Sequence, residues 1–112
     1  MTSAKYTLNI DKNSHYEVVF SFYEDDSITP LSFNGYEAIF VARERNSPQS
    51  KILFVPDELL ISENNVILKV NAETSKQVVP EVGYFNLILK NQTSKTRIIE
   101  GDIKLTRSID EN

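Results

Sequence analysis

The sequence predicts an all-β sandwich or barrel of about seven short antiparallel strands, with one short helical turn before a C-terminal hairpin. Segments in which apolar and polar residues alternate recur along the chain, and turn-forming segments separate them about every 8–12 residues. The 112 residues include only three glycines and four prolines, too few for a repetitive or disordered chain. We therefore expect a single domain over residues 1–112, with an ordered core at 6–107 and polar ends.

Three strands are expected in the first half of the chain. The first covers residues 6–10 and should lie at a sheet edge. The clearest alternation follows at 15–23, where four large residues share one face: Tyr16, Val18, Phe20 and Phe22. The next strand covers 36–45 and is apolar on both faces, because Ile39 and Val41 lie opposite the presumed core residues. A neighbouring subunit or loop would cover that second face.

Shorter elements are expected in the middle of the chain. Residues 51–55 form a strand that Pro56 ends. The apolar run at 57–61 is too short for its periodicity to separate a strand from a helical turn. Residues 65–70 form another strand, and 72–77 contain helix formers after a possible N-cap at Asn71.

A hairpin of two long strands, 84–90 and 96–107, is expected to organise the fold. The connection, residues 91–95, lacks the Asn-Gly or Asp-Gly pair of a two-residue turn, so a longer and more mobile loop is expected. Gly101 interrupts the apolar face of the second strand. We interpret it as room for a bulky side chain from the facing sheet.

The composition argues against several function classes. The chain has no cysteine and a single histidine, His15, which argues against disulfides, thiolate metal sites and multi-histidine sites. A net charge of −4 disfavours non-specific nucleic-acid binding. The first residues lack the apolar stretch of a signal peptide, so none is expected, and no apolar run approaches the roughly 20 residues of a membrane span. We expect a soluble protein made in the cytoplasm, with no cofactor, metal, nucleic-acid or membrane partner.

Two polar features of the sequence offer groups for catalysis or metal binding. The cluster Glu24-Asp25-Asp26 offers oxygen ligands for a cation, but it lacks the ligand spacing of a calcium loop, so a solvated turn is favoured. His15 could act as a general base, yet no nucleophile lies in a Gly-x-Ser-x-Gly context, and a surface role is favoured. No catalytic, cofactor-binding or metal-binding residue is therefore predicted, and the protein is expected not to be an enzyme.

Aromatic residues flank the acidic loop at 24–35. Tyr23, Phe33 and Tyr36, together with Asp25 and Asp26, could bind a sugar. A role in strands or core is favoured, because tyrosine and phenylalanine are common in strands.

Four arginines lie at expected strand ends or on outer faces, and they could pair with acidic residues of a neighbouring protein: Arg43, Arg45, Arg97 and Arg107.

The order of motifs resembles a known family. Tyr16-Glu-Val-Val-Phe-Ser-Phe22 precedes a loop with Pro30-Leu31 and then Asn34-Gly-Tyr-Glu-Ala-Ile-Phe-Val-Ala-Arg43. The run continues with Asn65-Val-Ile-Leu-Lys-Val70 before Ala72-Glu-Thr74, Tyr84-Phe-Asn-Leu-Ile-Leu89 and Arg97-Ile-Ile-Glu-Gly-Asp-Ile-Lys-Leu105. The run resembles small immunoglobulin-like β-sandwich virion proteins of tailed bacteriophages, and is similar to the N-terminal domain of phage upper baseplate proteins.

The resemblance implies an antiparallel immunoglobulin-like β-sandwich and a non-enzymatic structural or assembly role in a phage tail, neck or baseplate. It implies protein–protein contacts with itself, as a homo-oligomer, or with other phage structural proteins, in a virion assembled in the host cytoplasm. Two alternatives remain open. One is a carbohydrate- or other ligand-binding module near Tyr23, Phe33 and Tyr36. The other is a phage protein that binds a host protein through an exposed strand edge.

Overall fold

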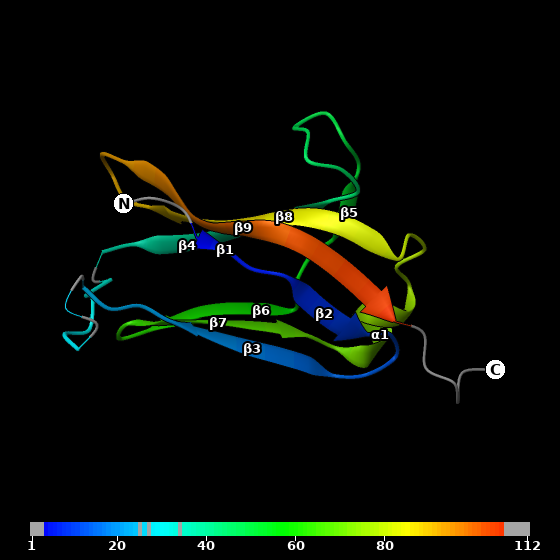
Figure 1. Ribbon diagram of the computed structural model, residues 1–112, viewed down its shortest axis with the longest axis horizontal. Helices are drawn as coiled ribbons and strands as arrows, with labels where there is room; N and C mark the ends of the chain where they lie inside the picture. The colour runs from blue at the N-terminus through cyan, green and yellow to red at the C-terminus, as the bar shows by residue number, and fades with distance from the viewer. Residues whose placement is uncertain (1–3, 25, 27, 34, 107–112) are drawn as a thin grey trace.

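Two β-sheets pack face to face, as Figure 1 shows. The structure is a computed structural model, and it describes residues 4–24, 26, 28–33 and 35–106. The larger sheet contains six strands: β1 (Ala4–Lys5), β2 (Leu8–Asp11), β4 (Glu37–Arg43), β5 (Ile52–Phe54), β8 (Val82–Lys90) and β9 (Lys95–Thr106). The smaller sheet contains three: β3 (Tyr16–Ser21), β6 (Glu58–Ser62) and β7 (Asn65–Val70). One helix, α1 (Ala72–Lys76), precedes β8.

The strand order is that of an immunoglobulin-like sandwich. The larger sheet runs β1-β9-β8-β4-β5, with β2 also paired to β9, and the smaller sheet runs β3-β7-β6. By their place in the chain and in the sheets, β3, β6 and β7 correspond to strands B, D and E of an immunoglobulin domain, and β4, β8 and β9 correspond to C, F and G. β5 extends the second sheet in the place of C′. The sequence has neither the cysteines nor the tryptophan that mark the core of antibody domains.

The core lies between the sheets and follows the alternation in the sequence. Along β8 the inward side chains Phe85, Leu87 and Leu89 are buried, and their neighbours are half-buried or exposed. The predicted inner face of 15–23 is confirmed, since Phe20 is buried and the other three large residues pack against the core. Phe85 stacks on Phe40, with ring centroids 5.5 Å apart. The two rings belong to neighbouring strands of the larger sheet, β4 and β8.

The N-terminal prediction was wrong in two respects. The expected single strand at 6–10 is two short strands, β1 and β2, and both run parallel to β9, so the sandwich is not purely antiparallel. The chain breaks between them because the Tyr6 backbone passes over Gly101 and donates its N–H to the carbonyl of Glu100. Tyr6 stays 46% exposed, whereas Leu8 and Ile10 are buried.

The interpretation of Gly101 was also wrong. A Cβ atom at this position would overlap the backbone of Tyr6, whose O, C and N atoms are its three nearest neighbours. The glycine therefore permits a close backbone approach within the larger sheet.

The remaining boundaries differ from the predictions in detail. Residues 57–61 proved to lie largely in a strand, β6, and the hairpin loop has four residues, 91–94. That loop is held by the Asn91 side chain, whose Oδ1 accepts hydrogen bonds from the backbone N–H groups of Thr93 and Ser94. The register of β8 and β9 shifts at Leu87/Ile88. This bulge buries both Ile98 and Ile99.

Helix α1 is capped from another part of the chain. Asn71 stands at its N-cap, but its side chain makes no capping hydrogen bond. The carboxylate of Asp57, just before β6, instead accepts hydrogen bonds from the Asn71 N–H (2.7 Å) and the Thr74 hydroxyl (3.0 Å). These bonds hold the pKa of Asp57 below its usual range, the bond from Asn71 having the largest effect.

Replacing Asp57 with alanine is expected to lower the melting temperature at pH 7, because two bonded donors lose their acceptor. A carboxyl whose folded pKa is depressed stabilises the fold above its ordinary pKa of 3.8, and that contribution is lost as the pH falls through the folded value. The wild-type and D57A melting curves, followed by circular dichroism, should therefore converge below about pH 4. Thr74→Val removes only one of the two bonds and should produce part of the loss. A constant difference at all pH values would contradict this account.

Candidate functional site

The three aromatic residues near the acidic loop, Tyr23, Phe33 and Tyr36, do not form one surface. Phe33 is buried and makes edge contacts with Phe22 and Tyr36, at centroid distances of 5.3 and 6.4 Å. Tyr23 is exposed and pairs with Pro30 across the loop. The favoured assignment to the core is thus correct for Phe33, and only Phe33 and Tyr36 come together.

The acidic cluster uses one of its carboxylates within the loop. Asp26 accepts hydrogen bonds from the N–H groups of Ile28 and Thr29, both at 2.8 Å, and from the Thr29 hydroxyl at 2.6 Å. The bonds from Thr29 are the main reason that the pKa of Asp26 is lowered. Asp25 lies outside the described residues. The hydrogen bonds of Asp26 support the favoured interpretation, a turn that carries charge at the surface.

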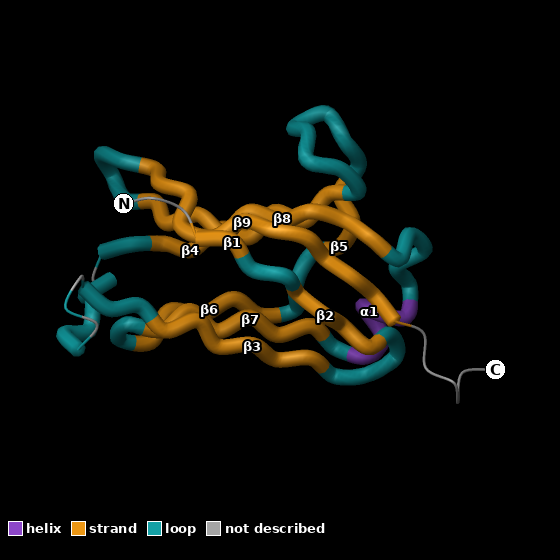
Figure 2. Tube along the Cα trace, viewed as in Figure 1, coloured by secondary structure: helices purple, strands orange, loops and turns teal. Residues whose placement is uncertain are grey.

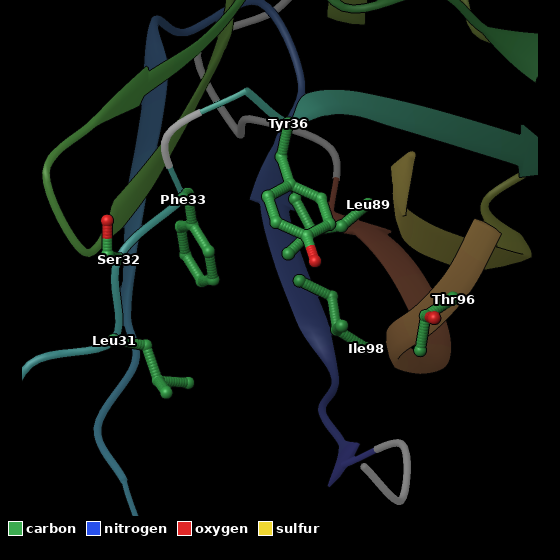
Figure 3. A pocket seen from close by; sticks show the side chains of 7 residues that line it. All are labelled: Leu31, Ser32, Phe33, Tyr36, Leu89, Thr96 and Ile98. Atoms are coloured by element: carbon green, nitrogen blue, oxygen red, sulfur yellow. The ribbon is translucent and has the colours of Figure 1, made fainter. Parts of the chain in front are cut away.

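A cavity of about 220 Å³ lies at the end of the sandwich where the loop before β4 meets the β8–β9 hairpin. Figure 3 shows Phe33, Tyr36 and Ile98 pointing into it. Seven residues line it: Leu31, Ser32, Phe33, Tyr36, Leu89, Thr96 and Ile98. In antibody variable domains the corresponding B–C and F–G loops bind antigen. The walls are mainly apolar, with hydroxyl groups of three residues among them, so the cavity suits a small apolar or aromatic group better than a sugar.

A basic groove runs over the outer face of the larger sheet. Its cavity measures about 370 Å³, and residues 46–48 form one wall. These residues belong to the loop between β4 and β5, which rises above the sheet in Figure 2. Four cationic residues line it, Arg43, Arg45, Lys95 and Arg97, and none of its described lining residues is acidic. Val41 and Ile88 contribute apolar atoms. Three of the four predicted arginines thus converge, whereas Arg107 lies outside the described residues.

Hydrogen bonds position the groove's side chains. The guanidinium of Arg43 donates to the carbonyl of Ser50 at 2.6 Å, which ties β4 to the loop. Tyr84 donates its hydroxyl to Glu100, and that bond is the main reason that the pKa of Tyr84 is raised. Arg97 also lies 3.5 Å from the Glu100 carboxylate. The side-chain oxygen of Asn86 is buried in the groove without a hydrogen-bond partner among the described residues.

The outer face of the smaller sheet carries a feature that the sequence reasoning missed. The strand register aligns Val19 on β3, Ile67 on β7 and Leu60 on β6 in one row across the sheet. Val19 and Leu60 are each 49% exposed, and Ile67 is half-buried. A parallel row holds Glu17, Lys69 and Glu58, with Lys69 3.4 Å from Glu58. Each strand supplies only one apolar residue to this row, so no single segment signals it.

His15 lies next to the start of α1, where its charge contributes to the lowered pKa of Asp57. His15 is exposed, and its Nδ1 accepts a hydrogen bond from the Ala72 N–H at the start of α1, at 3.4 Å. No cluster of three or more metal-ligating His, Cys, Asp or Glu side chains occurs among these residues. Within the same described residues, no helix has the length and apolar character to cross a membrane.

No family model and no curated protein matches the sequence. A solved structure similar to this chain is that of the extracellular domains of the voltage-gated sodium channel beta4 subunit, whose parallel homodimers explain its role in cell-cell adhesion. The sequences are 13% identical, the TM-score is 0.49, and the match covers 97% of each chain. A likeness this distant does not extend to function.

Proposed function

We propose that this immunoglobulin-like domain is a non-enzymatic protein-interaction module. The apolar row of Val19, Ile67 and Leu60 carries the proposal, because it lies on a sheet face that a solitary sandwich leaves in water. Burying such side chains stabilises an interface by about 25 cal/mol per Å² of apolar surface, before the costs of association. The half-buried Ile39, Val41 and Ile88 on the outer face of the larger sheet add a second apolar surface.

The narrower proposal is a structural or assembly component of a tailed-phage tail, neck or baseplate. Its support is the resemblance of motifs such as Asn34–Arg43 and Arg97–Leu105 to phage β-sandwich virion proteins. Under this proposal the partners are copies of the same chain or other phage structural proteins. The protein is assembled into the virion in the host cytoplasm, without a cofactor and without binding nucleic acid or a membrane.

Mass spectrometry of purified phage particles from the strain that encodes the chain tests the narrower proposal. The chain should be present in a fixed ratio to the known tail proteins after the particles are washed in high salt. Its presence in the infected lysate but absence from the particles would contradict a virion role and favour a host-directed protein.

The cavity beside Phe33 and Tyr36 favours a second candidate function, binding of a small ligand. Nuclear magnetic resonance titration with small aromatic compounds and with monosaccharides should shift the methyl signals of Leu89 and Ile98 if the cavity binds one of them. Tyr36→Ala should weaken any such shift. Unchanged methyl signals throughout would remove this candidate.

A further inference from the structure

We infer that the two outer faces of the sandwich bind each other in different copies of the chain, so that the protein assembles head to tail. The basic groove on the larger sheet of one copy would receive the outer face of the smaller sheet of the next. This inference rests on the proposed protein-interaction function and specifies its partner, a second copy of this chain.

The larger sheet supplies a cationic surface with an apolar floor. Arg45 and Lys95 are exposed, Arg97 is exposed and lies 3.5 Å from the Glu100 carboxylate, and Arg43 is held in the groove by its bond to the Ser50 carbonyl. The whole chain carries a net charge of −4, so this concentration of positive charge runs against its overall balance. A complementary partner is therefore acidic and carries apolar side chains at its centre.

The outer face of the smaller sheet has these properties. Its row of Glu17, Lys69 and Glu58 holds two carboxylates and one ammonium group, so the row is acidic on balance. The apolar row of Val19, Ile67 and Leu60 lies next to it, two residues away on each strand. Both faces therefore combine an apolar strip with charge, and the charges are opposite in sign.

The placement of the two faces sets the mode of assembly. They lie on opposite sides of the molecule, because each is the outward side of one layer in Figure 1. A contact between unlike faces leaves one free groove and one free acidic face at the two ends, so further copies can add. Such heterologous contacts close into a ring or extend as a filament. A two-fold contact between grooves would instead place cations against cations.

Variants that reverse the charge of one face or of both faces test this inference. Multi-angle light scattering measures the mass of each variant in solution over a range of protein concentrations. The wild-type chain should form species larger than a monomer, and these should dissociate as salt rises. E17K/E58K and R45E/K95E should each raise the concentration for half-assembly at least about tenfold, because each opposes like charges. The chain with all four substitutions should assemble close to the wild-type concentration, since the charges are exchanged and attract again.

The control E24K/E63K makes the same charge change as E17K/E58K at exposed positions outside the two rows and the groove, and it should assemble as the wild type does. Circular dichroism melting confirms that each variant folds. An oligomer that E17K/E58K leaves intact, or a fourfold variant that stays dissociated, would overturn the head-to-tail arrangement and leave the interaction function standing. A wild-type monomer at every attainable concentration would overturn self-assembly altogether, and detection of the chain in virions would then show that the partner is another protein.

Discussion

Replacing Phe85 with alanine is expected to destabilise the domain by about 3–5 kcal/mol, the range for removing a large aromatic side chain from a packed core. Phe85 is fully buried and stacks on Phe40. Its cross-strand neighbours are Ala42 on β4 and Gly101 on β9, and neither has a side chain larger than a methyl group. These neighbours cannot fill the cavity that the substitution creates. The loss is a large part of the roughly 5–15 kcal/mol by which domains are stable.

Chemical denaturation in urea measures this effect, and Val82→Ala is the matched control. Val82 lies on the same strand and is exposed, so its truncation should change the free energy of unfolding by no more than about 0.5 kcal/mol. Equal losses in the two variants would show that Phe85 is not at the centre of the core.

Gly101→Ala is expected to cost about 3 kcal/mol, toward the upper end of the range for overpacking. The added Cβ meets the backbone of Tyr6, which cannot rotate away as a flexible side chain can. The segment between β1 and β2 must therefore move off β9, which breaks the hydrogen bond from the Tyr6 N–H to Glu100. Hydrogen exchange should accordingly show that the Tyr6 amide loses its protection, together with the pairing of β1.

Gly35→Ala separates this clash from the general effect of replacing a glycine. Gly35 has a φ of 81° and no neighbour near an added Cβ, so alanine there meets only the strain of a left-handed conformation, about 1 kcal/mol. In G35A the Tyr6 amide should remain protected from hydrogen exchange. A protected Tyr6 amide in G101A would contradict the close approach at Gly101.

Regular alternation made most of the fold predictable from the sequence. In the strands at 16–21 and 82–90 every second residue is more buried than its neighbours, and the inner faces inferred from that period are the inner faces of the structure. Long-range backbone contacts were not predictable. The parallel pairing of β1 and β2 depends on where Tyr6 meets Gly101, a contact between residues that are distant in the sequence. The cap that Asp57 provides for α1 is equally non-local.

The candidate surfaces show the same division. The sequence placed arginines on outer faces, but their convergence with Lys95 in one groove requires the register of β4, β8 and β9. The apolar row on the smaller sheet is created by the alignment of three strands, each of which contributes one residue. In the neighbouring row, the same alignment places Lys69 between Glu17 and Glu58. Surfaces built across strands are therefore set by register, which local periodicity does not report.

Cross-linking of single-cysteine variants tests the central claim, that the two outer faces meet in different copies. The chain has no cysteine, so V19C and V41C each carry one thiol, the first on the smaller sheet and the second in the groove. One variant carries an affinity tag, and a short bismaleimide is added to each alone and to the mixture. We predict a dimer that joins V19C to V41C in the mixture and little product from either variant alone. Dimers of V19C with itself or of V41C with itself, or no linked product in the mixture, would contradict the account.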